Sequence, residues 1–185
     1  MGQQFSEIST KIQEFIHKQK IFFVGTATTD SRVNISPKGM DSFKIINANR
    51  VLWLNVTGSG NETAAHVEQS PRMTIMFAAF EGSPIILRLY GTAKAIHRND
   101  PQWDELSQHF ELLPGARQIF DVKIDLVQKS CGMAVPFFDF QGPRDQLKEW
   151  AAKKDQAEME DYWATKNQTT IDGKPTLIMQ KSVQS

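Results

Sequence analysis

The feature that most restricts the fold of this chain is a succession of short apolar or alternating runs, separated by turn residues, along much of its 185 residues. β-branched and aromatic residues are frequent in these runs, and Gly, Pro, Asn and Asp gather between them, which is typical of strands joined by tight turns. The runs cover residues 21–28, 32–37, 42–48, 51–57, 72–80, 85–98 and 118–130, with Gly91 as the expected bend in the longest. A doubly wound parallel sheet would need a helix after almost every strand, and only a few helical stretches occur. We therefore predict a mainly β (α+β) fold, an antiparallel barrel of about six strands with flanking helices.

Three stretches have the spacing of helices. They are an amphipathic helix over 5–18, a helix that begins after Asp100 and continues to about residue 113, and a last helix over about 142–163. No repeat or interdomain linker interrupts the chain, so we expect a single domain over 1–185. Its expected parts are an N-terminal helix in 1–20, the barrel in 21–130, and a C-terminal helix with a loop-like tail in 131–185.

One unit in this order, residues 51–77, carries a candidate ligand site. VLWLNVT predicts a buried strand, GSG a turn, NETAAHVEQS a short helix with Asn61 as its N-cap, and RMTIMF a second strand. A glycine turn that opens a helix leaves backbone N–H groups free for an anion, most often a phosphate, although an ordinary tight connection has the same pattern. Thr63 stands where the dinucleotide fingerprint needs Gly or Ala, and no Lys-Ser or Lys-Thr follows the glycines. These two nucleotide loops are therefore excluded, and a phosphate site of another kind remains.

The charge balance and the rare residues argue against several other classes of function. Lys plus Arg and Asp plus Glu number 21 each and no basic run occurs, so neither nucleic acid nor a membrane surface is expected as a partner. The four histidines lie far apart without the spacing of metal ligands, so no metal site is expected. A single cysteine excludes an internal disulfide, and neither a secretory signal nor a membrane span is recognisable, so we expect a cytoplasmic protein.

Four segments, taken in order, resemble one family. FFVGTA, VNISPKG, GSGNETAAH…PRMTIMF and LRLYGTA follow one another as in the FMN-binding split barrel of pyridoxamine 5′-phosphate oxidase-like proteins, over roughly residues 20–130. The resemblance is most specific in VNISPKG and TGSGNETAAH, and the ending resembles an uncharacterised subgroup of the same superfamily. It implies a split barrel, FMN as the cofactor, and a homodimer with the flavin in a cleft at the subunit interface. The C-terminal part would then pack on the barrel or on the dimer partner.

The resemblance also implies where the FMN phosphate binds. The glycine loop and the helix start would hold it, through Ser59, Asn61, Thr63 and backbone N–H groups, and Thr57 and Glu62 are further cofactor-binding candidates in this unit. Where the oxidase carries a serine followed by Arg-Lys, this chain has Asn61, Glu62 and Thr63, so an acid and a hydroxyl replace two phosphate-neutralising cations. Positive charge would have to come from elsewhere, and the candidates are Lys38, Arg72 and Arg88.

The strand 33–38 resembles the one that lines the flavin ring. The backbone of Asn34, Ile35 and Ser36 would meet the polar edge of the ring, and Lys38 would lie near its N1/O2 side, where a cation raises the flavin potential. The residues alone leave alternatives open: Lys38 is otherwise a solvated turn lysine, and Arg88 a solvated residue on the barrel exterior.

The activity that the resemblance implies is that of an FMN-dependent oxidoreductase, which transfers a hydride between a small molecule or a nicotinamide and flavin N5. No side chain is recognisable as an acid–base catalyst, so the catalytic residues stay unassigned. After residue 130 the chain lacks the Arg- and His-bearing segment with which pyridoxamine phosphate oxidases grip substrate phosphate, which argues against that particular activity. The alternative is a non-catalytic protein that binds or carries flavin or haem, which the loss of the two cations favours.

Overall fold

Eight antiparallel strands form the body of the protein in a computed structural model that describes residues 2–111 and 113–183. They are β1 (Gln3–Phe5), β2 (Phe22–Thr26), β3 (Asn34–Lys38), β4 (Phe43–Asn47), β5 (Arg50–Val56), β6 (Arg72–Ala78), β7 (Ile85–His97) and β8 (Ala116–Cys131). Seven of them neighbour one another in the order β3-β2-β6-β7-β8-β5-β4, and β1 pairs with β8. The predicted antiparallel barrel with flanking helices is confirmed, with eight strands in place of about six.

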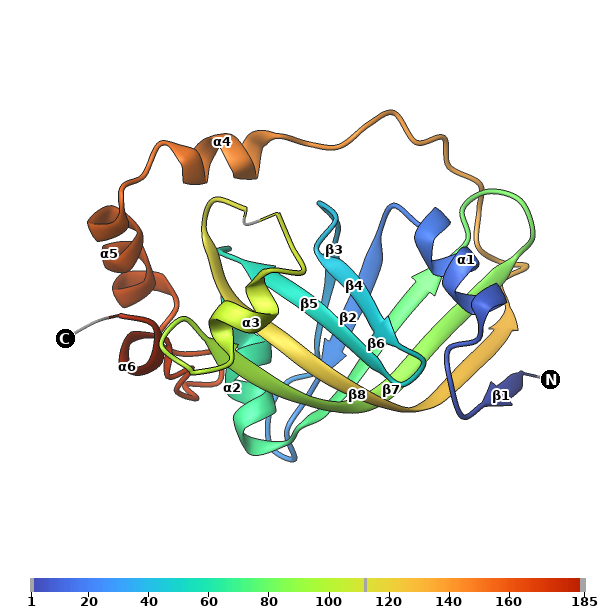
Figure 1. The fold of residues 1–185 in the computed structure, drawn as a ribbon, viewed down its shortest axis with the longest axis horizontal. Coiled ribbons are helices and arrows are strands. Elements are labelled where there is room, and N and C mark those ends of the chain that lie inside the picture. The colour runs from blue at the N-terminus through green and yellow to red at the C-terminus, as the bar shows by residue number, and fades with distance from the viewer. Residues whose placement is uncertain (1, 112, 184–185) are drawn as a thin grey trace.

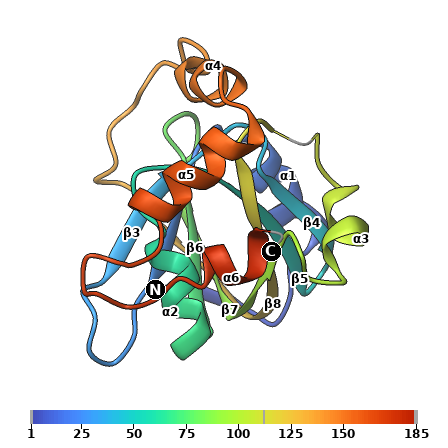
Figure 2. The ribbon, with the colours of Figure 1, turned by 90° about the vertical axis from the view of Figure 1, so that its left-hand side faces the viewer.

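Six helices within the described residues lie around this barrel. They are α1 (Thr10–Lys18), α2 (Glu62–Gln69), α3 (Trp103–Ser107), α4 (Gln146–Ala152), α5 (Gln156–Lys166) and α6 (Ile178–Ser182). α1 lies at one end of the barrel, whereas α2, α5 and α6 gather at the other (Figure 1, Figure 2). The segment from Gly132 to Asp145 crosses over the top of the barrel to reach α4 (Figure 1).

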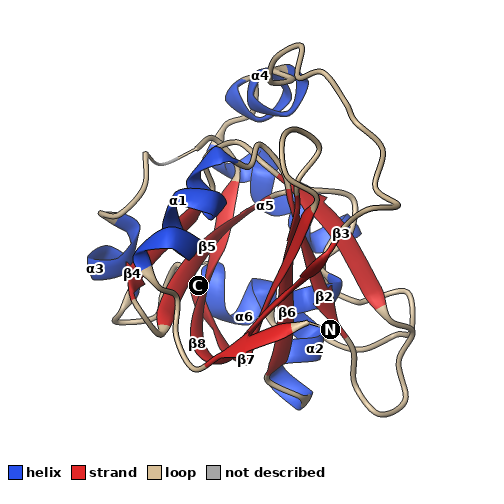
Figure 3. Cartoon of the chain, turned by 90° about the vertical axis from the view of Figure 1, so that its right-hand side faces the viewer, coloured by secondary structure: helices blue, strands red, loops and turns tan. Residues whose placement is uncertain are grey.

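The core divides between the inside of the barrel and an outer face beneath α3. β5 contributes to both, since Val51 and Trp53 belong to the interior cluster and Leu52 and Leu54 to the outer one. Burial on both faces explains why VLWL is a continuous apolar run rather than an alternating one. Inside the barrel, Trp53 stacks on Phe120 of β8 with ring centroids 4.8 Å apart. Figure 3, seen from the end where α1 lies, shows the strands curved around this interior.

β7 and β8 are the longest strands, and Gly91 lets them approach closely. The register of their pairing shifts between Tyr90 and Gly91. A Cβ atom at Gly91 would lie 2.1 Å from the carbonyl oxygen of Lys123, so a larger residue would force the strands apart. The bend predicted at Gly91 is confirmed, and its cause is steric.

The predicted helices are longer than the observed ones, for reasons of tertiary contact. α1 begins at Thr10 because residues 3–5 pair with β8 as a strand. The helix expected to continue to residue 113 is reduced to α3, since Phe110 and Leu113 reach the outer core from irregular backbone. Its residue 112 lies outside the described residues, as do residues 1, 184 and 185 of the predicted domain.

The last predicted helix, over 142–163, is two helices in the structure. Asp155 accepts a hydrogen bond from the backbone N–H of Glu158, whose side chain accepts one from the Asp155 N–H, and this capping box begins α5 anew after α4. The tail, predicted as loop, contains the short helix α6, whose Ile178 packs with Met159 and Trp163 of α5.

Candidate functional site

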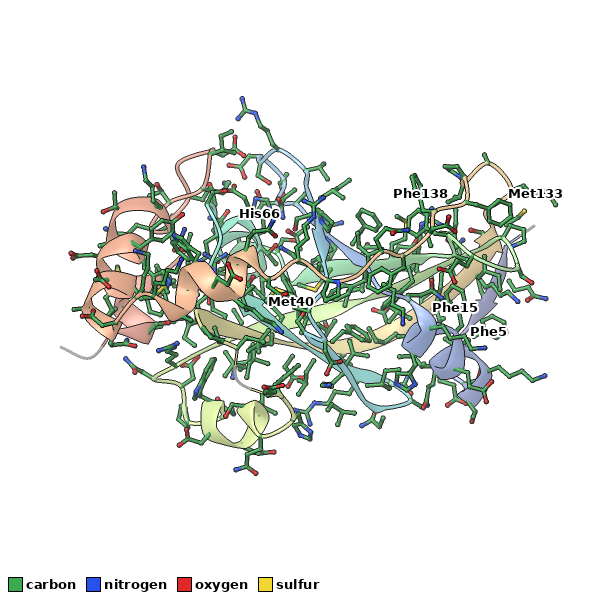
Figure 4. The ribbon with its side chains drawn as sticks, turned by 90° about the horizontal axis from the view of Figure 1, so that it is seen from above. Phe5, Phe15, Met40, His66, Met133 and Phe138 are labelled. Carbon is green, nitrogen blue, oxygen red and sulfur yellow. The ribbon has the colours of Figure 1, made fainter. Side chains whose placement is uncertain are left out.

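A cleft of about 610 Å³ lies beside β3, one of the two edge strands of the sheet. Its walls come from β3, the β3–β4 connection, the end of β5, the glycine loop at 58–60 and the first turn of α2. Arg32 and Val33 before β3, Arg117 of β8, Leu147 of α4 and Ile171 of the tail complete the lining. In Figure 4, Met40 of the β3–β4 connection marks the cleft near the middle of the molecule. The volume falls within the range of small-molecule sites, about 300–1,000 Å³.

β3 presents alternate side chains to this cleft, as the pleat of a strand dictates. Asn34, Ser36 and Lys38 line it, whereas Ile35 points to the opposite face and is 67% exposed. There Ile35 and Arg88 line a second hollow of about 600 Å³, on the side of β2, β3, β6 and β7 that faces away from the barrel interior. Two of the predicted cofactor-binding residues, Ile35 and Arg88, therefore lie outside the cleft.

The glycine loop and α2 bring the other predicted residues to the cleft. These are Thr57, Ser59, Asn61, Glu62 and Thr63. Thr63 Oγ1 accepts a hydrogen bond of 3.2 Å from Asn34 Nδ2, which joins α2 to β3. The two most specific motifs of the sequence, VNISPKG and TGSGNETAAH, therefore meet at one site.

Asn61 precedes α2 as predicted, but its side chain does not cap the helix. The residue is 2% exposed, and neither Nδ2 nor Oδ1 has a hydrogen-bond partner within the described part of the chain. Buried amides are nearly always hydrogen-bonded in folded proteins. Because Asn61 lines the cleft, both atoms are available to a ligand there.

Arg117, at the start of β8, brings a buried positive charge to the same loop. It is 3% exposed; Nη1 donates to Asn167 Oδ1 at 2.5 Å, and Nη2 donates to the carbonyl oxygen of Gly60 at 2.7 Å. Nε has no partner, and none of the ion pairs between described residues includes Arg117. Burial lowers the pKa of Arg117 to about 9, which leaves the guanidinium charged at neutral pH. A buried cation without a counter-ion favours an anionic ligand.

Lys38 adds a second cation from β3. Its Nζ lies 5.0 Å from the ring centroid of Trp53, a cation–π distance, and it forms no ion pair with a described carboxylate. Burial, and secondly the charge of Arg117, lower the pKa of Lys38 to about 8. The lysine is thus half-buried against the cleft and is not the solvated turn residue that the sequence left open.

The tail fixes the acid that the sequence placed beside the expected phosphate. Glu62 accepts hydrogen bonds from the backbone N–H of Ile171, with N···O distances of 3.2 and 3.3 Å to its two carboxylate oxygens. The neighbouring Asp172 forms an ion pair with Arg32. The carboxylate of Glu62 is therefore engaged by residues 169–175, which close on themselves through a bridge between Thr169 and Pro175.

The C-terminal end of α5 is bonded to the glycine loop. Trp163 Nε1 donates to Thr57 Oγ1 at 2.8 Å, and that hydroxyl donates to the carbonyl oxygen of Gly115 at 2.7 Å. Asn167 Nδ2 donates to the carbonyl oxygen of Gly58 at 3.0 Å. Figure 2 shows α5 across this end of the barrel, next to α2. The C-terminal segment thus packs on the barrel of its own chain and supports the cleft.

Arg117 is the residue at the cleft that sequence reasoning missed. The sequence reads PGARQIF there, and PGAR indicated a break before a strand at residue 118. β8 begins two residues earlier, at Ala116, and Arg117 is buried with its first residues. An arginine at the start of a strongly apolar strand was the available signal.

The described lining of the cleft lacks several residue types that commonly act in catalysis. Among the described residues that line it there is no His, Cys or Tyr. No group of His, Cys, Asp and Glu suited to a metal ion occurs in the described residues. No described helix is both long enough and apolar enough to cross a membrane.

Comparison with known proteins identifies relatives of this chain. The family model of pyridoxamine 5′-phosphate oxidase matches residues 8–131. The pyridoxamine 5′-phosphate oxidase family protein ustO of Aspergillus flavus is 35% identical over 140 residues, which are 73% of this chain and 56% of that protein. This chain therefore spans little more than half the length of that curated relative.

Two solved structures share the fold. A variant of HupZ from Group A Streptococcus has a TM-score of 0.54 at 17% identity, over 66% of this chain and 99% of that one. A candidate pyridoxamine 5′-phosphate oxidase from Lactobacillus delbrueckii has a TM-score of 0.53 at 16% identity, over 66% and 94% of the two chains. At these identities the structures establish the fold alone, whereas the family model covers most of the barrel. This chain belongs to the pyridoxamine 5′-phosphate oxidase family.

Proposed function

We propose that this protein binds FMN in the cleft beside β3 and acts as an FMN-dependent oxidoreductase. The observation that carries the proposal is the meeting of two unpaired cations, Arg117 and Lys38, with the unpartnered amide of Asn61 in one cleft of suitable size. Membership of the oxidase family supports the same reading.

The residues present fit a phosphorylated flavin at both ends. For the phosphate, the cleft offers the first turn of α2, the amide of Asn61, the hydroxyl of Ser59 and the guanidinium of Arg117. For the flavin ring, it offers Asn34, Ser36 and Lys38 of β3 and, behind them, the ring of Trp53. Thr57 acts indirectly, because its hydroxyl already bonds Trp163 and Gly115.

FMN, when bound, supplies the hydride and electron transfer of this family of reactions. The described cleft lining contains no histidine, cysteine or tyrosine. The chain's own residues therefore have to bind the flavin, orient the substrate and exclude water. The charge of Lys38 would stabilise negative charge on an adjacent ligand group. Substrate and electron donor are a small molecule or a nicotinamide, as the family resemblance implies.

A non-catalytic flavin carrier is the second candidate, and one observation favours it. Glu62 is the one carboxylate among the described lining residues, and the Ile171 N–H already engages it. A carrier needs no proton donor or acceptor, so this lining suits it as well as an enzyme. A haem carrier is less well supported, because haem proteins use His, Cys, Met or Tyr as axial ligands and only Met40 is present in the described lining.

We also propose that the protein is a homodimer. Val33, just before β3, and Ile35 of β3 are 70% and 67% exposed; both line the second hollow, and Val33 also lines the cleft. Exposed apolar surface of this kind is typical of a protein–protein contact. Sedimentation of the wild type should give twice the mass of one chain, and Ile35→Asp should shift the protein towards the monomer.

The function is tested by adding FMN to the purified protein, with the absorption spectrum and the quenching of flavin fluorescence as readouts. Stoichiometric FMN binding is expected, followed by oxidation of NADH, NADPH or another donor in steady state. Binding without turnover by any donor would favour the carrier. A protein that ignores FMN would contradict both flavin candidates, and a Soret band would support haem.

A further inference from the structure

The first turn of α2 has no cation of its own. Glu62 and Thr63 begin the helix, and Glu62 carries negative charge into the cleft lining. A phosphate placed there needs a counter-charge from outside the helix. Arg117 of β8 reaches the same loop, where its Nη2 bonds the carbonyl oxygen of Gly60, one residue before Asn61.

We propose that Arg117 is the phosphate-binding cation of this cleft and that Asn167, at the end of α5, is the positioning residue that aims it. The C-terminal segment is then part of the phosphate subsite rather than an appendage of the barrel. This inference rests on the proposed function, because the phosphate in question is that of FMN. It assigns the cation of the subsite to β8 and its positioning residue to the end of α5, 50 positions later in the sequence.

Two unpaired hydrogen-bond donors lie at this subsite. They are Arg117 Nε and Asn61 Nδ2, both buried, on residues that are 3% and 2% exposed. Burying a full positive charge without a counter-ion is costly, and an anion removes most of that cost. A phosphate group offers acceptors to the guanidinium, to the Asn61 amide and to the N–H groups of the helix start at once.

Asn167 determines where the guanidinium of Arg117 lies. It is 0% exposed, accepts from Arg117 Nη1 at 2.5 Å and donates from Nδ2 to the carbonyl oxygen of Gly58. Its own carbonyl oxygen accepts from Thr176 Oγ1 at 2.5 Å, which holds it from the tail. One amide thus bridges the cation and the glycine loop, so loss of α5 docking would displace the cation.

Coupling between ligand and C-terminal segment follows from this geometry. A phosphate that binds better when Arg117 is held by Asn167 must, by linkage, stabilise the docked state of α5. Trp163 of the same helix is bonded to Thr57 and buried, so it moves out of a dry environment when α5 undocks.

The test compares FMN with riboflavin, which lacks the phosphate, on the full chain. Arg117→Met should weaken FMN binding roughly 10- to 100-fold, the range for a charge-assisted hydrogen bond, and change riboflavin binding less than about twofold. Asn167→Ala should lower the ratio of FMN affinity to riboflavin affinity by a smaller factor than Arg117→Met does. The matched control is Arg88→Met, since Arg88 bonds Ser130 and lines the second hollow, so it contacts neither the cleft nor α5. Its FMN-to-riboflavin ratio should equal that of the wild type.

Hydrogen exchange of the wild-type protein tests the proposal even if a variant does not fold. Inorganic phosphate, and separately FMN, should slow hydrogen exchange of residues 156–167, whereas chloride at equal ionic strength should not. Equal affinity for FMN and riboflavin, or phosphate without effect on 156–167, would overturn the subsite and leave flavin binding intact. If neither flavin binds but phosphate still protects 156–167, the proposed function fails and the phosphate subsite stands.

Discussion

The cleft and the second hollow are nearly equal in volume, about 610 and 600 Å³, and both are lined by cationic side chains. In the second hollow, Arg72 is exposed and bonds Ser70, and Arg88 bonds Ser130. In the cleft, Lys38 is half-buried and Arg117 fully so, and neither forms an ion pair with a described carboxylate.

The difference shows that neither the volume of a hollow nor the number of its cationic side chains identifies a ligand site in this fold. Water already hydrogen-bonds a solvated arginine and screens its charge, so an anionic ligand gains little binding energy from it. A buried guanidinium held by an amide and a carbonyl has lost its water and still lacks an anion. Buried polar atoms without partners therefore separate the cleft from the second hollow.

The largest effect is expected when the two cations of the cleft that form no ion pair are removed together; the third, Arg32, is paired with Asp172. Lys38→Met with Arg117→Met should lower FMN affinity at least about 100-fold, since each charge-assisted hydrogen bond contributes about 1.5–3 kcal/mol. Arg72→Met with Arg88→Met makes the same change of charge in the second hollow and should alter FMN affinity less than about twofold. Fluorescence titration of the wild type and of the two double variants with FMN measures both effects. A large loss in the second pair would move the site to the second hollow and restore Arg88 as a cofactor-binding residue.

Asn61→Ala should show how much the buried, unpartnered amide of Asn61 lowers the stability of the apoprotein. The side chain makes no capping hydrogen bond, so the usual loss of about 1 kcal/mol on removing an N-cap does not apply. Removing two buried unpartnered atoms should leave the apoprotein as stable or raise its free energy of unfolding by about 1 kcal/mol. FMN affinity should fall roughly tenfold at the same time. Urea unfolding of the apoprotein, paired with FMN titration, checks both directions; a clear loss of stability would mean that Asn61 is bonded within the protein.

The titration of Lys38 should move stability and affinity in opposite directions with pH. Its pKa in the fold is about 8, against an ordinary value of 10.5, so between these values the unfolded chain binds more protons and stability rises with pH. Over the same window the cleft loses positive charge, first from Lys38 and then from Arg117, whose pKa is about 9, and FMN affinity should fall about 3- to 10-fold between pH 7 and 9.5. Lys38→Met should remove the part of both slopes near pH 8 and leave the part that belongs to Arg117. An affinity that is flat with pH in the wild type would show that Lys38 does not face the ligand.

The sequence predicted the barrel because strand alternation and turn chemistry are local signals. The run VLWL indicated a buried strand, and Gly91 indicated a bend or bulge; the strand is buried on both faces, and the pairing register shifts at Gly91. The alternation of β3 also follows from local geometry, which puts Asn34 and Lys38 on the cleft side and leaves Ile35 on the other.

The remainder of the site depends on contacts that no local pattern encodes. Arg117 is buried because Asn167, 50 residues later, and the carbonyl of Gly60, 57 residues earlier, receive its N–H groups. The tail, which has little periodicity, holds Glu62 through a backbone N–H of Ile171, a donor that every residue type except proline possesses.

The smallest expected effect concerns Glu62, the one feature of the described cleft lining that works against an anion. Its carboxylate lines the cleft at the start of α2, where the helix dipole favours a negative charge by about 0.3–1 kcal/mol, and it also receives the Ile171 N–H. Glu62→Gln keeps an acceptor for that N–H and removes the charge, so FMN affinity should rise about two- to threefold while the free energy of unfolding falls slightly. Glu62→Ala is the control that loses the acceptor as well. Because the tail residues 169–175 then lose one of their bonds to α2, Glu62→Ala should not share the gain in affinity. If Glu62→Gln instead weakens FMN binding, the carboxylate is bonding a hydroxyl or N–H group of the ligand. The cleft would then bind FMN through a carboxylate as well as through cations, and the unpaired cations alone would not distinguish it from the second hollow.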